Sequence, residues 1–368
     1  MATQPLQSEV FRLDTLFRSD TLPGLRPFFE SSPELKSLVE LHLLQIRAIV
    51  DADVVHRELR WRLGSRQKPD ARSGLEEAID AGMLALIAPT FLKIEIEKYL
   101  EVIADDTGAT LDEAQREWGR FQAKLCFYQP LPHVIDIGVV DPKDLPYKHA
   151  SDDLALPVYT RDPHLQTMGA PVMWVSIDTV CLDHARATSV KLGFMVGSTY
   201  TVTVGAEAFK AAIRGIKNLF EGFRGLPSWL QFAIGASVAA ALIHPKSRAK
   251  LLEGWDSVRN AATKFKGPLF DAFLVLMRQL AEAESAARNA HRQIQSALPP
   301  AQKATAIVYA RRVCVLSQTA LTIPEIARRM LNEGYVPRGQ DPEAYPRRVM
   351  RQSGQFVSDS SGMWTLQS

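Results

Sequence analysis

Short apolar segments alternate with helical patterns between residues 46 and 175, and this alternation constrains the fold more than any other feature of the chain. The apolar segments, which we expect to be strands, are AIVDADVV, LALIAP, HVIDIGVV, LPVYT and APVMWVSI. Between them the sequence predicts a basic loop at 56–72, a helix near 74–82, a long helix from Thr90, a helical stretch at 110–128 and a short helix after Asp144. Strands that alternate with helices form a parallel sheet with helices on both faces.

The length of 368 residues exceeds what one hydrophobic core usually supports, so we expect several domains. Hydrophobic content of 46% and charged content of 23% are ordinary values for globular proteins and exclude wholesale disorder. The expected parts are an N-terminal helical extension over 1–45, the parallel-sheet domain over 46–180, an all-α middle region over 181–298, and a C-terminal domain over 301–368 that follows the break at Pro299-Pro300.

Net charge and cysteine content limit the partners and the compartment. The net charge is only +2, so affinity for nucleic acid must come from local basic patches and bound metal. Three cysteines, Cys126, Cys181 and Cys314, lie far apart, which disfavours a disulfide framework and a structural zinc site. The first 30 residues contain no unbroken apolar stretch, so we expect no secretory signal and a cytoplasmic location.

Two acidic residues stand at positions where a carboxylate is costly or faces inward. Asp51 lies within the apolar segment AIVDADVV, where an unpaired carboxylate needs a partner or a metal. Helical spacing places Glu95 on the face of Leu92 and Tyr99, so Glu95 points inward and Glu97 outward. The alternative for Glu95 is a partly exposed helix acid.

Two further acids, Asp144 and Asp162, each lie in a loop just before a helix start. Ligands of parallel sheets bind outside the carboxyl ends of the strands, where such loops lie. Each of the two acids could instead be a helix N-cap. Asp53 could replace Asp51, and Asp141 could replace Asp144.

Four motifs in order, IVDADVV, PTFLKIE, DPKDLPYKHA and VYTRD, resemble those of the PIN-domain nucleases over about 130 residues. The resemblance implies a small α/β sheet whose acids bind Mg²⁺ or Mn²⁺ and cleave RNA, less often DNA flaps. It also implies that the site residues are Asp51, Glu95, Asp144 and Asp162, accompanied by the hydroxyl of Thr160. The helical insertion between Glu95 and Asp144 is longer than in the shortest family members. Many members act as toxins paired with an antitoxin.

The residue types fit this chemistry independently of the resemblance. Clusters of carboxylates hold hard divalent cations next to phosphates, and two such ions promote in-line attack by water. We therefore expect products with 5′-phosphate and 3′-hydroxyl ends. The sequence contains no recognisable Ser/His/Asp or Cys/His nucleophile grouping, P-loop or GxGxxG motif.

A basic segment follows the first acid and is interleaved with Trp61. It could form a rim that contacts phosphates, with Arg57 and Arg60 as nucleic-acid contacts, or it could be a solvated helix face. The cationic residues of this segment are His56, Arg57, Arg60, Arg62, Arg66, Lys68 and Arg72.

The middle region contains an amphipathic basic helix at 207–223 and an uncharged stretch at 228–244. The uncharged stretch is at the short limit for a membrane span, so a buried or oligomer-forming helix is our default interpretation and membrane insertion is the alternative.

The C-terminal 65 or so residues predict two helices and a hairpin. Thr322 and Glu325 form a helix-cap signal, and Gly334 is a stop signal before EAYPRRVMRQ and the hairpin QFVSDSSGMWTL. This pattern resembles a winged helix-turn-helix, particularly the accessory HARE-HTH type found beside chromatin factors and restriction nucleases. If it binds nucleic acid, the contacts are Arg347, Arg348 and Arg351 of the second helix. The alternative is a winged helix that docks a protein.

These patterns together predict a cytoplasmic, metal-dependent endoribonuclease that cleaves single-stranded RNA, acts as a toxin or defence effector and forms homo-oligomers. An antitoxin or regulatory protein would be its partner. DNA remains an alternative substrate, because both polymers share the phosphate that the metal ions act on. Two other functions stay open: a nucleic-acid-binding regulator with a catalytically silent PIN fold, and a membrane-associated effector that uses 207–244.

Overall fold

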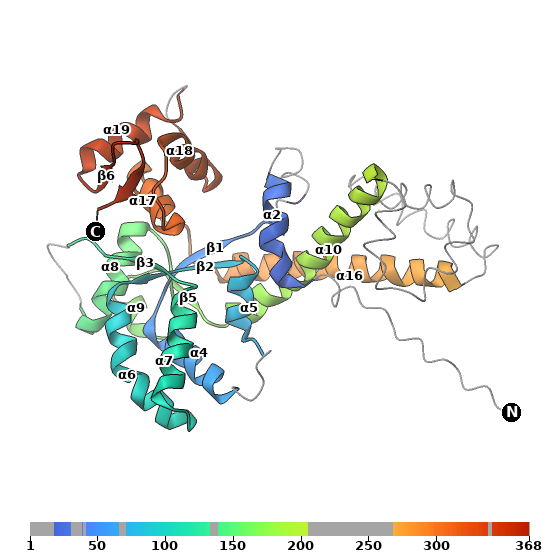
Figure 1. The fold of residues 1–368 in the computed structure, drawn as a ribbon, viewed down its shortest axis with the longest axis horizontal. Coiled ribbons are helices and arrows are strands. Elements are labelled where there is room, and N and C mark those ends of the chain that lie inside the picture. The colour runs from blue at the N-terminus through green and yellow to red at the C-terminus, as the bar shows by residue number, and fades with distance from the viewer. Residues whose placement is uncertain are drawn as a thin grey trace. The chain divides into compact units, whose positions relative to one another are not determined.

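The computed structural model, drawn in Figure 1, describes six stretches of the chain and one single residue. The described residues are 18–30, 39, 42–65, 71–132, 139–204, 268–337 and 341–367. The chain divides into two compact units, one formed by residues 1–44 and 182–292 and the other by residues 45–181 and 293–368.

A five-stranded parallel sheet forms the centre of the second unit, in the order β3-β2-β1-β4-β5. The strands are β1 (Ile46–Val50), β2 (Leu84–Pro89), β3 (Cys126–Tyr128), β4 (Val158–Thr160) and β5 (Val172–Trp174). Most strand residues are buried, because helices cover both faces of the sheet. The predicted α/β class, a parallel sheet flanked by helices, is therefore confirmed.

The helices form two layers around the sheet (Figure 1). On one face lie α4 (Ala52–Gly64), α6 (Phe91–Thr107) and α7 (Leu111–Gln122), which pack against one another. On the other face α8 (Leu145–Leu154) packs against β1, β2 and β4, next to α17 (Ala306–Ser317). Short elements complete this unit: α5 (Gly74–Asp80), the 3₁₀ helix η3 (Pro142–Asp144) and α9 (Pro163–Thr167).

The order of the strands creates a switch point between β1 and β4. The chain runs from β1 outward to β2 and β3, then returns through α8 to the opposite side of β1 for β4 and β5. In open parallel sheets this reversal separates the loops at the carboxyl ends of the two central strands, where ligands bind. Asp51 follows β1 and Thr160 ends β4, so both stand at this switch point.

Three predicted elements differ from the structure. The strand expected over AIVDADVV ends at Val50, because the residues after Asp51 have helical spacing and bury Val54, Val55 and Leu59 in α4. The same helix replaces the first part of the basic loop expected at 56–72. The helical stretch expected over 110–128 ends at Gln122 and is followed by β3, a strand too short to show alternation in the sequence.

The described C-terminal residues, 301–337 and 341–367, form three helices and a two-stranded antiparallel hairpin. The elements are α17, α18 (Ile323–Asn332), α19 (Ala344–Ser353), β6 (Phe356–Ser358) and β7 (Trp364–Leu366). Ile326, Met330 and Met350 are fully buried in a common core. The predicted cap at Thr322 is confirmed, since its side chain accepts from the backbone N–H of Glu325, whereas α17 was not predicted.

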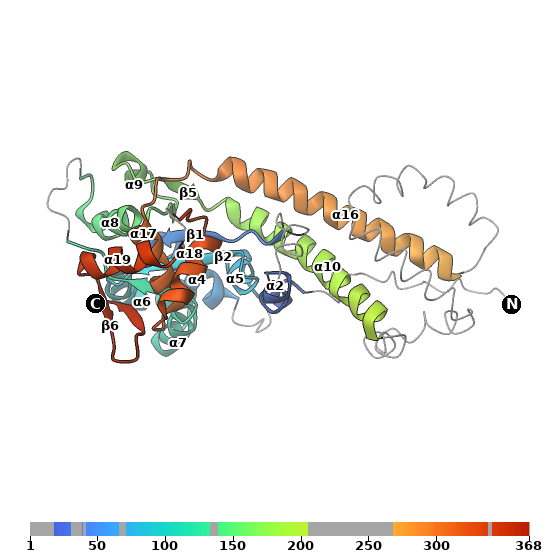
Figure 2. The ribbon, with the colours of Figure 1, turned by 90° about the horizontal axis from the view of Figure 1, so that it is seen from above.

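The first unit contains the helices η1 (Ser19–Thr21) and α2 (Leu22–Glu30) and most of α10 (Ile177–Val204) and α16 (Pro268–Ala297). Figure 2 shows the two long helices, and Lys191 of α10 forms an ion pair with Glu284 of α16. The predicted end of α16 before Pro299-Pro300 is confirmed.

Several predicted features lie outside the described residues. They are more than half of the N-terminal helical extension expected over 1–45, the strand expected over HVIDIGVV except its last two residues, the basic helix at 207–223 and the uncharged stretch at 228–244. Among the described residues, no helix is long and apolar enough to cross a membrane.

Candidate metal centre

Asp51 stands at the carboxyl end of β1, between the sheet and α4. Its backbone N–H donates to the carbonyl of Tyr159 over 3.1 Å, which continues the ladder between β1 and β4 by one residue. Only 6% of Asp51 is exposed, and its carboxylate accepts a hydrogen bond from the hydroxyl of Thr160. Thr160 is completely buried and its oxygen also accepts from the backbone N–H of Asp162 over 2.8 Å. One hydroxyl therefore fixes both Asp51 and the loop that carries Asp162.

Asp144 ends η3 and occupies the N-cap position of α8. Its side chain makes no capping hydrogen bond to that helix, which argues against a role as a simple helix cap. Asp144 is 8% exposed, and among the described residues its buried Oδ2 atom has no hydrogen-bond donor. A buried carboxylate oxygen with this environment is costly unless a cation or a proton compensates it.

Asp162 and His164 lie beside Asp144 at the start of α9. Asp162 is the N-cap of α9 and accepts from the backbone N–H of His164 over 2.8 Å, so this acid caps a helix and also lies beside Asp144. One potential ligand atom from each of Asp144, Asp162 and His164 lies within 4.8 Å of the others. This is the group that the described residues offer for a metal ion, and it contains two of the four predicted acids.

Glu95 reaches the same region from α6 on the opposite face of the sheet. Its carboxylate accepts a hydrogen bond of 2.5 Å from the hydroxyl of Tyr147, which is buried on α8. Burial and then the negative charge of Glu95 raise the pKa of Tyr147 above its ordinary value, so this hydroxyl stays a donor. Glu95 is half-buried and Glu97 is exposed, which confirms the predicted orientation of both.

Burial and mutual repulsion raise the pKa values of Asp51 and Asp144, the two most buried of the four predicted acids. The pKa of Asp51 rises to about 7, chiefly through burial; the hydrogen bond from Thr160 opposes the rise, and the charges of Asp144 and Asp53 add to it. The pKa of Asp144 rises to about 6, first through burial and then through neighbouring carboxylates. Close carboxylates with raised pKa values form a site where a bound divalent cation would replace the protons.

The repulsion acting on Asp144 also shows which acids lie near one another. Asp162, Asp141 and Glu95 each raise its pKa, and His164 lowers it. Together with the repulsion between Asp51 and Asp144, these effects bring all four predicted acids into one electrostatic cluster.

The two alternative acids fit the site less well. Asp53 is exposed in the first turn of α4, and Asp141 caps η3 by accepting from the backbone N–H of Lys143 over 2.9 Å. Asp51 and Asp144 are therefore the better candidates for ligands, because each places a buried carboxylate at the switch point.

The sequence did not indicate His164 or Tyr147. His164 follows Asp162 by two residues, and the motif Asp-Pro-His would have been its signal. Tyr147 lies three residues after Asp144 on the predicted short helix, but only the fold shows that it faces Glu95.

The predicted basic rim on α4 is paired with carboxylates. Arg57 forms an ion pair of 3.0 Å with Asp178, and Arg60 forms one of 3.0 Å with Asp106. These contacts favour the solvated helix face that was the alternative interpretation of this segment. Contact with nucleic acid through Arg57 and Arg60 stays a prediction.

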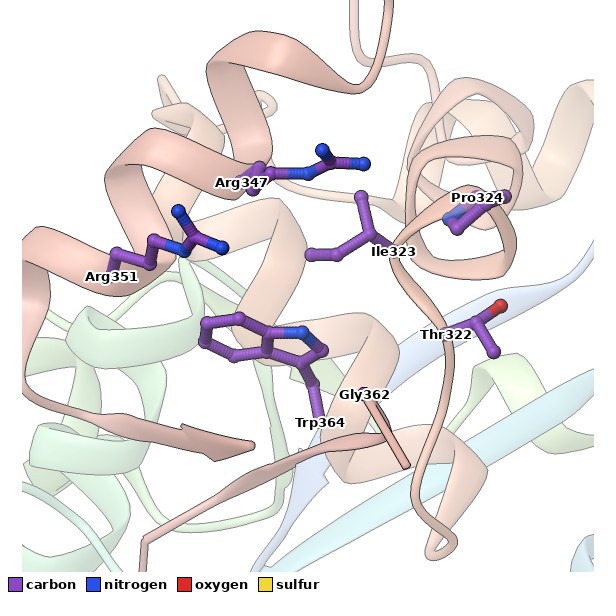
Figure 3. A pocket seen from close by; sticks show the side chains of 7 residues that line it. All are labelled: Thr322, Ile323, Pro324, Arg347, Arg351, Gly362 and Trp364. Carbon is purple, nitrogen blue, oxygen red and sulfur yellow. The ribbon is translucent and has the colours of Figure 1, made fainter. Parts of the chain in front are cut away.

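A second polar site, the α19 pocket, lies in the C-terminal region (Figure 3). Arg347 and Arg351 extend from α19 above Trp364 of β7, facing the start of α18. Arg347 also pairs with Glu343 over 3.2 Å, whereas the guanidinium group of Arg348 lies 5.1 Å from the ring of Tyr345. The residues that line the pocket are Thr322, Ile323, Pro324, Arg347, Arg351, Gly362 and Trp364.

No protein-family model, curated protein or solved structure matches this chain.

Proposed function

We propose that this chain is a metal-dependent phosphodiesterase of the PIN-domain type that cleaves single-stranded RNA as an endoribonuclease. The observation that carries the proposal is the group of Asp144, Asp162 and His164 at the carboxyl edge of a parallel sheet, with Asp51 and Glu95 near enough to interact electrostatically with Asp144. These acids come from four separate loops or helices. Packing alone would not bring four negative charges together, whereas a bound divalent cation would stabilise them and hold a phosphate beside them.

The donor set fits a divalent cation. The Oδ2 atom of Asp144, which no donor among the described residues compensates, belongs to the residue that groups with Asp162 and the imidazole of His164. Carboxylates favour Mg²⁺ and Mn²⁺, and the imidazole favours Mn²⁺ of the two. When bound, such a cation supplies polarisation of the phosphate and neutralisation of the charge that develops on the leaving oxygen.

The chain's own residues orient the acids and hold protons. The Thr160 hydroxyl donates to Asp51 and thereby fixes which carboxylate oxygen remains available at the switch point. With a pKa near 7 in the metal-free protein, Asp51 accepts or releases a proton at neutral pH. Tyr147 holds Glu95 in place from the opposite layer. These two acids are therefore each positioned by a second group, as catalytic carboxylates require.

A second function, binding of nucleic acid by the C-terminal region, is favoured by the α19 pocket. Arg347 and Arg351 on one helix offer two cations for phosphates, and the buried ring of Trp364 lies beneath them. We propose that this region is a winged helix-turn-helix that recruits the substrate. If the acids bound no metal, the same pocket would support a nucleic-acid-binding regulator with a silent PIN fold.

The resemblance to the PIN-domain nucleases suggests a biological setting for this activity. We propose a cytoplasmic toxin or defence effector that assembles as a homo-oligomer and is restrained by an antitoxin or regulatory protein. The alternative of a membrane-associated effector depends on residues 207–244, which lie outside the described part of the chain.

The experiment that tests the activity compares cleavage of labelled single-stranded RNA and DNA in Mn²⁺, Mg²⁺ or EDTA. We expect Asp144→Asn to lower the rate by about 10² or more, the usual loss when one group that stabilises transition-state charge is removed. Asp53→Asn is the matched control, because Asp53 is exposed two residues from Asp51 and should leave the rate unchanged. Failure of every polymer to be cleaved, with no metal bound, would refute the proposal and favour the regulator.

A further inference from the structure

A row of three residues marks the carboxyl edge of the sheet beside the candidate metal centre. Val50 pairs with Tyr159, so Asp51, one residue on, is level with Thr160. Thr160 in turn pairs with Trp174, the last residue of β5. Neighbouring strands lie about 4.8 Å apart, so Trp174 stands roughly 10 Å from Asp51 along this row.

Trp174 is exposed where the rest of its strand is buried. It is 39% exposed, whereas Val172 and Met173 before it are buried. Paired residues of parallel strands project to the same face, so the indole lies on the face to which Thr160 points. An indole that is accessible at the rim of an acidic site offers a flat apolar surface to a ligand.

Arg161 adds a cation at the same edge. It follows Thr160 directly, precedes Asp162 and is exposed. Among the described residues no carboxylate forms an ion pair with it, in contrast to Arg57 and Arg60 on α4. A guanidinium group in this place can contact a phosphate next to the one held at the acids.

We infer that Trp174 and Arg161 form a nucleotide-binding rim, in which the indole stacks on an unpaired base and the guanidinium group contacts a flanking phosphate. This inference rests on the proposed function and deepens it, because it names what the site selects. A base within a duplex presents no free face, so the rim favours a single strand with an unstacked base beside the cleaved bond. Arg161 contributes affinity without regard to the base.

The test measures binding by fluorescence anisotropy in EDTA, where no cleavage occurs, with the full chain. The two probes are labelled oligouridine and an oligomer of equal length whose nucleotides are abasic. We expect Trp174→Ala to weaken binding of oligouridine about 10- to 100-fold, the range typical of a lost base–aromatic stack, and to leave the abasic oligomer unchanged. Trp174→Phe should retain most of the affinity.

Two further variants separate stacking from charge and from general loss of structure. Leu111→Ala shortens an apolar side chain of similar exposure at the start of α7, away from every candidate nucleic-acid contact, and should change neither probe. Arg161→Ala should weaken both probes equally and reduce the slope of log affinity against log salt by roughly 0.7.

The possible outcomes distinguish this inference from the proposed activity. Equal losses of both probes in Trp174→Ala, unchanged binding of oligouridine, or no binding of oligouridine by the wild type would each overturn the stacking role. If the protein shows metal-dependent cleavage together with any of these results, the proposed phosphodiesterase activity holds and the nucleotide-binding rim is refuted. Base-dependent binding without cleavage would keep the rim and refute the nuclease.

Discussion

Asp51→Asn should make the metal-free protein more stable, although it removes a residue of the candidate site. The pKa of Asp51 is about 7 in the folded protein, against an ordinary value of 3.8. A pKa raised by folding means that the folded state holds its proton more tightly than the unfolded state does. The stabilisation from this proton is fully present below pH 3.8 and is lost as the pH rises to about 7.

The size of the effect follows from the shift. Each pKa unit corresponds to about 1.4 kcal/mol, so ionising Asp51 costs the metal-free protein about 4 kcal/mol at pH 8 and somewhat under about 2 kcal/mol at pH 5. Asparagine keeps the shape and can accept the hydrogen bond from Thr160, but it carries no charge. The stability difference between variant and wild type should therefore grow by roughly 3 kcal/mol from about pH 5 to about pH 8.

Urea denaturation in EDTA at several pH values measures this difference. For the unit that contains the sheet, the expected gain in the free energy of unfolding of Asp51→Asn at pH 8 corresponds to a rise in Tm of roughly 8–15 °C. Asp53→Asn, at an exposed neighbouring position, removes a contribution to the raised pKa of Asp51 that is smaller than those of burial and Asp144, so its stability should stay much closer to the wild type than that of Asp51→Asn at each pH. A pH-independent difference, or a wild type more stable than Asp51→Asn at pH 8 without metal, would refute the argument that Asp51 is ionised at a cost.

Three other predictions concern the metal and the contacts around it. Saturating Mn²⁺ should make the wild type more stable than Asp51→Asn, the reverse of their order without metal. The Tm of the wild type should rise more at pH 8 than at pH 5, because its acids must lose protons to bind the ion, and the Tm of Asp144→Asn should rise little. An equal rise in the Tm of the wild type and of Asp144→Asn would place the ion elsewhere. Tyr147→Phe should cost about 1.5–3 kcal/mol in urea denaturation, the value of a hydrogen bond to a charged group, and slow cleavage without changing its metal requirement. Arg311→Ala should destabilise the sheet unit by about 3–5 kcal/mol in the same assay, because Arg311 is buried against Asp153, whereas Arg328→Ala, which breaks an exposed ion pair, should cost under about 1 kcal/mol.

The sequence predicted those parts of the fold that depend on long periodic patterns. The strand LALIAP, the helix after Thr90 and the inward face of Glu95 follow from the spacing of apolar residues, and each is confirmed. The predicted end of β1 was wrong, because the apolar residues after Asp51 suit a buried strand as well as a buried helix face. Only the packing of α4 against α6 distinguishes the two.

The site was predictable as far as its acids but not in its supporting contacts. Asp51 and Asp144 precede helices and lie in motifs that the sequence displays. Tyr147 and Thr160 support acids that are distant along the chain, Glu95 by 52 residues and Asp51 by 109. Such contacts depend on the return of the chain across the sheet, and no local pattern encodes them.

The helix α8 connects the acidic site with the C-terminal region. Its first turns supply Asp144 and Tyr147, which face the switch point. At its other end the backbone turns through a left-handed residue, Ala155, and Arg312 of α17 donates to the carbonyls of Leu154 and Ala155. Helix C-termini carry unsatisfied carbonyls and partial negative charge, so a guanidinium group there completes the helix.

The same contacts give the C-terminal region a structural role at the site. Arg311 donates to the carbonyl of Asp153, and the Asp153 carboxylate accepts from the hydroxyl of Tyr128 over 2.9 Å, which joins α17, α8 and β3. α17 is therefore one of the elements that hold α8, together with β1, β2 and β4, which pack along the same helix. The C-terminal region therefore does more than present the α19 pocket: it caps the far end of the helix at whose start Asp144 stands.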